Sequence, residues 1–236
     1  MKKILFPTDF SEISRNAFVF ALKLAKTINA EIITLHTYEF PQVNYIDMPV
    51  YLPDIYEVTE LSNFENYKGH IPVLHSIAEK HQLESIKISN VLESGDLIDS
   101  IIEITHKEKI DYIVMGTKGS GGLAATFLGS VTEKVINNSH IPILAIPEDC
   151  EYNTIKRILF TTTYKTEEIE VLKRIGILAK SLQAHVDCLY VKPPHLAVDD
   201  VIMEDWRKLF PTEEVSFHSV HTVDAEGAIL EFMAHY

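Results

Sequence analysis

The sequence predicts an α/β protein: an open, doubly wound parallel sheet of five strands, followed by an incomplete second copy of the same unit. Three observations predict this fold. Short apolar runs alternate with helix-like segments along the chain, as in parallel sheets that are covered by helices on both faces. Short sequence matches recur 154 positions apart, and five of the nine glycines cluster directly after one predicted strand.

Length and composition limit the class of protein. The chain has 236 residues, of which 46% are apolar and 23% charged, a balance that allows one large or two small domains with buried cores. The net charge of −13 is spread over both halves and opposes binding to polyphosphate backbones and anionic membranes. We therefore expect no nucleic-acid and no membrane partner.

No apolar run approaches the ~18 residues of a membrane span, and the early Pro7 and Asp9 end the only leader-like run. The two cysteines, Cys150 and Cys188, lack the spacing of a zinc or thioredoxin-like motif. We expect a soluble, cytoplasmic protein in which both are small buried side chains.

The first copy, residues 1–150, contains five predicted strands. Continuous apolar runs predict strands covered on both faces, and apolar residues spaced by three and four predict helices. Ser11 is the expected N-cap of the first helix. The elements expected in order are strand 4–6, helix 12–28, strand 31–37, helix 66–82, strand 86–92, a helix from about 96 to 106, strand 112–115, helix 131–138 and strand 143–146.

Residues 38–60 interrupt this alternation with three prolines and five aromatic residues. The segment is longer than the ~2 to 6 residues of an ordinary βα connection. We expect a loop that packs on its own domain, or alternatively a lid or a dimer contact.

The second copy, residues 151–236, repeats the first three βα units. Lys3-Ile4-Leu5-Phe6 recurs as Arg157-Ile158-Leu159-Phe160, and Leu24-Ala25-Lys26 recurs as Leu178-Ala179-Lys180. A truncated copy would expose a hydrophobic sheet edge unless something else covers it. The expected elements are strand 157–161, helix 166–182, strand 184–191, helix 198–209, strand 215–220 and a helix from 225.

A glycine-rich turn follows the fourth predicted strand, over residues 116–122, and Gly129 and Ser130 follow it. Glycines let backbone N–H groups approach phosphate oxygens without obstruction by Cβ. Ser130 and Glu133 have capping-box spacing, which predicts a helix that begins near Ser130 and directs its positive end toward an anion. The spacing is that of neither a P-loop nor a dinucleotide fingerprint.

Pro7-Thr8-Asp9 ends the first strand, which should adjoin the fourth where the strand order reverses. Ligands of open α/β sheets bind in that crevice. Asp9 could accept a ribose hydroxyl or hold Mg²⁺ against phosphates; alternatively it is only a carboxylate at a helix N-terminus. The two turns together favour a nucleotide.

The residues at these turns resemble a known family. Gly116-x-x-Gly119, nine residues, then Gly129-Ser130 resembles the ATP-binding motif of universal stress proteins, and Pro7-x-Asp9 with Ser11 resembles their N-terminal signature. The resemblance implies an adenine nucleotide alpha hydrolase-like fold with strand order 3-2-1-4-5, bound ATP and Mg²⁺, a stress-response role and a homodimer.

The resemblance covers residues 1–148 closely and 154–236 in outline, which implies a tandem member with a truncated, degenerate second repeat. There Thr163 stands where Asp9 would be and Thr161 replaces Pro7, so we expect no ATP binding by that repeat alone.

The nucleotide site that the resemblance implies combines both turns with the end of the second strand. Asp9 would meet the ribose or phosphates, and Thr37 and Met115 would flank the adenosine. The full set is Pro7, Thr8, Asp9, Thr37, Met115, Gly116, Thr117, Lys118, Gly119, Gly129, Ser130, Val131 and Thr132.

Three functions follow from the sequence. The first is an ATP-binding sensor or regulator with little or no turnover. The second is a slow ATPase or phosphotransferase that uses Asp9 and Lys118 around Mg²⁺, although no nucleophile with a neighbouring base is evident. The third is a nucleotide-free dimeric scaffold. Of the eleven histidines only His36, at the end of the second strand, is placed near the crevice, and a packing role is favoured for it.

Overall fold

The computed structural model describes residues 1–40, 52–117, 129–192, 200–211 and 214–235. The chain divides into two compact units, Met1–Tyr152 and Asn153–Tyr236, and each is described by itself. Within the described residues, no helix has the length and apolar character needed to cross a membrane.

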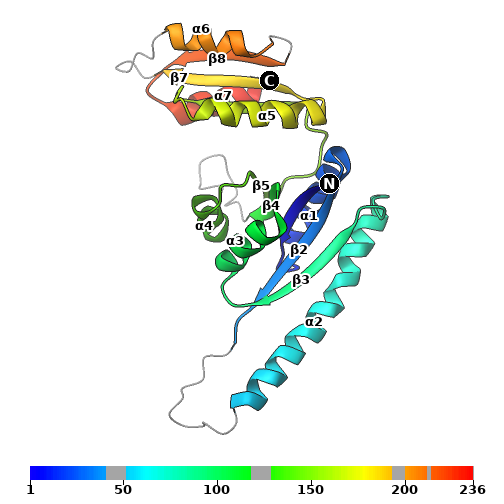
Figure 1. Ribbon diagram of the computed structural model, residues 1–236. Coiled ribbons are helices and arrows are strands. Elements are labelled where there is room, and N and C mark those ends of the chain that lie inside the picture. The colour runs from blue at the N-terminus through cyan, green and yellow to red at the C-terminus, as the bar shows by residue number, and fades with distance from the viewer. Residues whose placement is uncertain (41–51, 118–128, 193–199, 212–213, 236) are drawn as a thin grey trace. The chain divides into compact units, whose positions relative to one another are not determined.

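The first unit is built on a five-stranded parallel sheet with the order β3-β2-β1-β4-β5 (Figure 1). This is the predicted fold and strand order. Its strands are β1 (Lys2–Pro7), β2 (Ala30–Tyr38), β3 (Ile88–Ser94), β4 (Tyr112–Thr117) and β5 (Ile143–Pro147).

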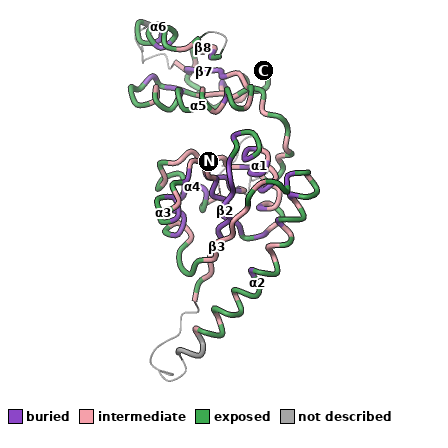
Figure 2. Tube along the Cα trace, turned by 45° about the vertical axis from the view of Figure 1, so that its right-hand side comes forward, coloured by how far each residue is buried: buried purple, intermediate pink, exposed green. Residues whose placement is uncertain are grey.

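Four helices cover the two faces of this sheet. They are α1 (Glu12–Ile28), α2 (Leu52–Lys80), α3 (Leu97–Glu108) and α4 (Ser130–Asn138). Helix α1 packs against α2 and α3 packs against α4, on opposite faces of the sheet (Figure 1). Buried residues concentrate in β2 and α1, whereas most of α2 is exposed (Figure 2).

The core explains why β1 and α1 form where the sequence predicts them. Ile4 and Phe6 face α1, where the ring of Phe18 lies 5.0 Å from that of Phe6, and Leu5 faces the cluster under α3. All four side chains are fully buried, and burying a side chain of this size contributes about 1.5–3 kcal/mol. Ser11 caps α1 as predicted, since its hydroxyl accepts from the N–H of Ser14.

Helix α2 begins earlier than predicted. Residues 52–60, expected to be a loop, belong to it. Pro53 is compatible with this because proline is tolerated in the first turn of a helix, where its missing N–H would have no partner. The remainder of the predicted loop lies largely outside the described residues, so the expectation that it packs on its own domain, and the alternative of a lid or dimer contact, stay predictions.

The second unit has a three-stranded parallel sheet with the order β6-β7-β8. Its core includes Leu172, Cys188, Tyr190 and Trp206. Helices and strands alternate in the predicted order. They are β6 (Arg157–Thr162), α5 (Glu168–Leu182), β7 (His185–Lys192), α6 (Asp200–Leu209), β8 (Val215–His221) and α7 (Ala225–His235).

The turn that follows the first strand has the same local geometry in both units. Phe10 and Tyr164, 154 positions apart, both have φ of 59°. The N–H of Phe10 donates to Thr8 Oγ1 at 3.0 Å, and that of Tyr164 donates to Thr162 Oγ1 at 2.9 Å. A tandem origin of the two units remains a prediction that this likeness supports.

Candidate functional site

A cavity of about 450 Å³ lies at the carboxyl ends of β1 and β4, within the size range of small-molecule sites. The two strands pair only at Ile4 with Tyr112 and Leu5 with Ile113, although they continue to Pro7 and Thr117. They separate toward their carboxyl ends, which opens the crevice where the strand order reverses.

The two predicted turns meet at this cavity. Eleven of the thirteen residues predicted for the site line it, and the other two, Lys118 and Gly119, lie outside the described residues. The described lining is Pro7, Thr8, Asp9, Ser11, Ile13, Ser14, His36, Thr37, Leu97, Met115, Gly116, Thr117, Gly129, Ser130, Val131 and Thr132.

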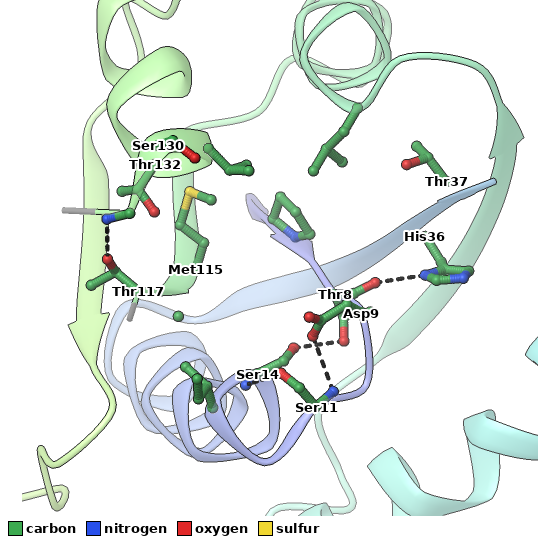
Figure 3. A pocket seen from close by; sticks show the side chains of 16 residues that line it. Thr8, Asp9, Ser11, Ser14, His36, Thr37, Met115, Thr117, Ser130 and Thr132 are labelled. Carbon is green, nitrogen blue, oxygen red and sulfur yellow. Dashed lines mark hydrogen bonds between the residues drawn. The ribbon is translucent and has the colours of Figure 1, made fainter. Parts of the chain in front are cut away.

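The β1–α1 turn forms one wall (Figure 3). The Thr8 N–H donates to the carbonyl of Leu35 at 2.8 Å, which fastens the turn to β2. The Thr8 hydroxyl bonds that of Ser14 at 2.7 Å and accepts from the Phe10 N–H. Asp9 Oδ1 accepts from the Ser11 N–H at 3.0 Å, so the exposed carboxylate is oriented by the start of α1.

The start of α4 forms the opposite wall (Figure 3). Gly129, not Ser130, is the N-cap, and within the described residues no side-chain cap bonds the N–H groups of the first helical turn, so the predicted capping box does not form. Ser130 is the first helical residue instead. The Gly129 N–H donates to Thr117 Oγ1 at 2.8 Å, while its carbonyl accepts from the Glu133 N–H. The N–H groups of residues 130–132 therefore lack intrahelical partners.

Two further helices begin at the cavity. Ile13 and Ser14 lie in the first turn of α1, and Leu97 is the first residue of α3. Asp96 caps α3 by accepting from the N–H groups of Ile98 and Asp99. Three helices therefore begin at one cavity, and the positive ends of their dipoles favour an anionic ligand there.

Sequence reasoning did not assign Ile13, Ser14 or Leu97 to the site. A signal for Leu97 was present in the sequence, because Gly95 follows the third predicted strand and carboxyl ends of parallel strands share one edge of a sheet. Ile13 and Ser14 could be placed only once the direction of α1 from its N-cap was known.

His36 packs against the turn and also lines the cavity (Figure 3). Its Nδ1 lies 2.8 Å from the Thr8 carbonyl oxygen. The Tyr67 ring stacks on the imidazole at 6.0 Å with 8° between the planes, and Phe10 lies at 5.1 Å. Burial raises the pKa of the Tyr67 phenol, so this neighbour stays neutral. The predicted packing role is present together with a polar contact.

Gly116 is required by packing as well as by any ligand. A Cβ built on it would lie 2.9 Å from Ile13 Cγ2 and 3.0 Å from the Ile13 carbonyl oxygen. Its role in holding phosphates stays a prediction, whereas its role in letting α1 approach β4 follows from these distances.

The sequence of residues 1–147 matches the Universal stress protein family. Two universal stress proteins of Methanocaldococcus jannaschii are similar to the chain. One is 32% identical over 146 residues, which cover 61% of this chain and 81% of the relative. The other is 30% identical over 155 residues, which cover 61% and 94%.

The fold is also similar to that of a solved structure. The crystal structure of a universal stress protein from Archaeoglobus fulgidus DSM 4304 has a TM-score of 0.69 and 20% sequence identity. The match covers 98% of this chain and 84% of that chain, so the similarity in fold includes the second unit.

Proposed function

The chain belongs to the universal stress protein family, and from this premise we propose that its first unit binds ATP in the crevice between β1 and β4. The protein would act as a nucleotide-dependent sensor or regulator in the stress response, with little or no turnover. We also expect a homodimer in the cytoplasm, as the family resemblance implies.

The observation that carries the proposal is the uncapped start of α4 opposite Asp9. One wall offers backbone N–H donors and a helix dipole, which suit the acceptor oxygens of a triphosphate. The other wall offers a carboxylate, which suits ribose hydroxyls or a cation. A nucleotide has both kinds of group at its two ends, so the chemistry of the two walls fits it.

Magnesium, if it accompanies the nucleotide, would be held by Asp9 together with phosphate oxygens. Mg²⁺ prefers oxygen ligands, and it commonly binds through one or two carboxylates plus substrate phosphates. The exposed position of Asp9 at the cavity wall is compatible with that arrangement. Bound Mg²⁺ would neutralise part of the phosphate charge, while Thr8 and Ser11 orient the turn that carries Asp9.

The proposal can be tested by replacing Gly129 with valine. The branched side chain would obstruct the approach of phosphates to the start of α4, and valine is a poor N-cap. We expect at least a tenfold loss of Mg-ATP affinity, corresponding to about 1.4 kcal/mol, by isothermal titration calorimetry. Thermal unfolding of the ligand-free variant shows whether it remains folded.

Gly69→Val is the matched control, because Gly69 lies on α2 and a Cβ added there would have nothing within 4 Å of it. Its affinity should match the wild type. Unchanged affinity in a folded Gly129→Val protein would contradict the assignment of the phosphate site.

Two measurements separate the alternatives. A nucleotide-free scaffold would give no adenine absorbance in an extract of the denatured protein and no thermal shift with Mg-ATP. An efficient ATPase would release ADP over many turnovers faster than about 1 s⁻¹, the low end of usual enzyme rates. We expect adenine in the extract and slower release.

A further inference from the structure

We infer that Thr117 is a positioning residue for the proposed phosphate site. Its hydroxyl oxygen holds the start of α4 against the end of β4, and the position of this helix start sets how strongly the phosphates of a nucleotide bind. The inference rests on the proposed function, because it concerns the same cavity. It gives Thr117 a role that requires no contact with the ligand.

The sheet holds Thr117 in place. It is the last residue of β4, it pairs with Pro147 of β5, and it is only 3% exposed. A β-branched side chain has few accessible rotamers, so burial gives its hydroxyl a defined position relative to the sheet. Thr117 also lines the cavity. It is therefore a fixed point at the edge of the crevice.

The hydroxyl of Thr117 is bonded to the N-cap of α4. The Gly129 N–H donates to Thr117 Oγ1 at 2.8 Å, across twelve positions of sequence (Figure 3). A serine or aspartate N-cap bonds the start of its helix through its own side chain, which glycine lacks. In α4 the corresponding constraint comes from β4, through the backbone N–H of the N-cap.

The first residues of α4 depend on this bond more than the rest of the helix does. Thr132 and Val135 are buried and anchor the body of α4, whereas Ser130 and Val131 are exposed. The N–H groups of residues 130–132, which lack intrahelical partners, follow directly after Gly129. Movement of Gly129 would therefore displace the donors proposed for the phosphates.

The bond should affect the two ends of a nucleotide differently. Hydrogen bonds to a charged phosphate are short and depend on the direction of the donor, so they are sensitive to the position of α4. Thr37 and Met115, which we expect to flank the adenosine, lie on β2 and β4 and are held by strand pairing. Loss of the Thr117 hydroxyl should therefore weaken binding of ATP and leave binding of adenosine nearly unchanged.

The test compares Thr117→Val and Thr117→Ser with the wild-type full chain. Valine replaces the hydroxyl by a methyl group, which accepts no hydrogen bond, whereas serine keeps the acceptor. By calorimetric titration with Mg-ATP we expect valine to weaken binding about tenfold, the effect of one lost hydrogen bond, and serine to remain within about threefold of wild type. Adenosine, titrated by NMR, should bind to all three proteins with affinities within about threefold of one another.

A measurement without ligand separates positioning from direct contact between Thr117 and the nucleotide. Exchange of the Gly129 N–H with solvent, followed by NMR, should be at least about tenfold faster in Thr117→Val than in wild type, because the amide loses its acceptor. In Thr117→Ser the exchange should be close to wild type. Urea unfolding shows whether the valine variant is folded, and Thr117→Ala takes its place if it is not.

Thr34→Val is the matched control. Thr34 is a fully buried threonine of β2 whose hydroxyl donates to Asn90 Oδ1 at 2.8 Å, and it is not among the described residues that line the cavity. The variant also loses a buried hydroxyl bond, so its stability should fall. Its Mg-ATP affinity and its exchange at Gly129 should match the wild type.

Three results would overturn the inference while leaving ATP binding intact: wild-type ATP affinity in a folded Thr117→Val protein, equal losses of affinity for ATP and adenosine, or wild-type exchange at Gly129 in that variant. Failure of the wild type to bind Mg-ATP would instead refute the proposed function. The exchange at Gly129 would then still report whether Thr117 holds the start of α4.

Discussion

At Gly116 the packing of α1 leaves room for no side chain. A methyl group there would lie within 3.0 Å of two Ile13 atoms, one of them the backbone carbonyl oxygen. That oxygen cannot move without displacing the first turn of α1, which also carries Ser14 at the cavity wall. The same glycine therefore affects both stability and the width of the crevice.

We expect Gly116→Ala to lower the free energy of unfolding by about 1–3 kcal/mol, the usual cost of overpacking. Mg-ATP affinity should fall with it, because α1 and β4 form two sides of the cavity. Urea unfolding followed by circular dichroism measures the first effect and calorimetry the second.

Gly176→Ala provides the matched control. Gly176 lies inside α5 with nothing within 4 Å of an added Cβ, so alanine should stabilise the helix by about 0.5–1 kcal/mol. Equal stabilities of Gly116→Ala and the wild type would show that α1 can shift away from β4 without loss of stability, and would contradict this packing argument.

The sequence was sufficient for the site residues whose chemistry is local. Gly129 and Asp9 lie in turns that composition and spacing mark, and both line the cavity. Ser14, His36 and Leu97 reach the cavity through strand pairing and helix direction, which no short motif records. For His36 the strand end could be located, but the bond to Thr8 depends on the register of β1 against β2.

At the scale of elements, the carboxylate of Glu168, the first residue of α5, accepts hydrogen bonds from the turn that precedes this helix. The Glu168 carboxylate accepts from the Thr162 hydroxyl at 2.7 Å, from the N–H and hydroxyl of Thr163 at 3.0 and 2.9 Å, and from the Lys165 N–H at 3.2 Å. Ser14 occupies the corresponding position in the first unit, 154 residues earlier, and lines the cavity. The second unit thus satisfies internally the donors around its first turn.

We expect Glu168→Gln to lower the stability of the second unit by about 1–2 kcal/mol at neutral pH, because hydrogen bonds to a charged group contribute more than those to a neutral one. Burial raises the pKa of this carboxyl, but its hydrogen bonds outweigh burial and hold the pKa below its usual range. The stabilisation is therefore present above the unfolded pKa of about 4.3 and is lost as pH falls through the folded pKa.

Trp206 is the single tryptophan of the chain and is buried in the second core, so its fluorescence reports urea unfolding of that unit. The control is Glu170→Gln, which removes an exposed pair with Lys173 and should change stability by less than about 0.5 kcal/mol. A difference between Glu168→Gln and wild type that persisted undiminished well below pH 4 would contradict the assignment.

Element types were predictable along the chain, but element boundaries were less so. Strands β1, β2 and β4 are short buried runs in a parallel sheet, and such runs have a clear signature. The predicted start of α2 was wrong because prolines and aromatic residues between 38 and 60 are typical of loops, although the first turn of a helix accepts proline. At α4 two adjacent residues could serve as N-cap, and the bond from the Glu133 N–H to the Gly129 carbonyl identifies Gly129 as the N-cap.

At the scale of the whole molecule, the two units have separate cores and only the first contains the described cavity. The first core joins β1, β2 and β4 to α3, while the second joins α5 and α6 to β7. Every described residue that lines the cavity lies within Met1–Tyr152. The proposed binding site therefore requires no described side chain from the second unit.

We therefore expect a protein of residues 1–152 to fold by itself and to bind Mg-ATP with the affinity of the full chain, within about threefold, or about 0.65 kcal/mol. A domain of about 150 residues buries roughly 68–70% of its unfolded surface, which is sufficient for an independent core. Circular dichroism and calorimetry on both proteins measure folding and affinity. If the shorter protein were folded but bound Mg-ATP more than tenfold less tightly, the second unit would have to contribute to the site directly, and the cavity of the first unit would not account for nucleotide binding alone.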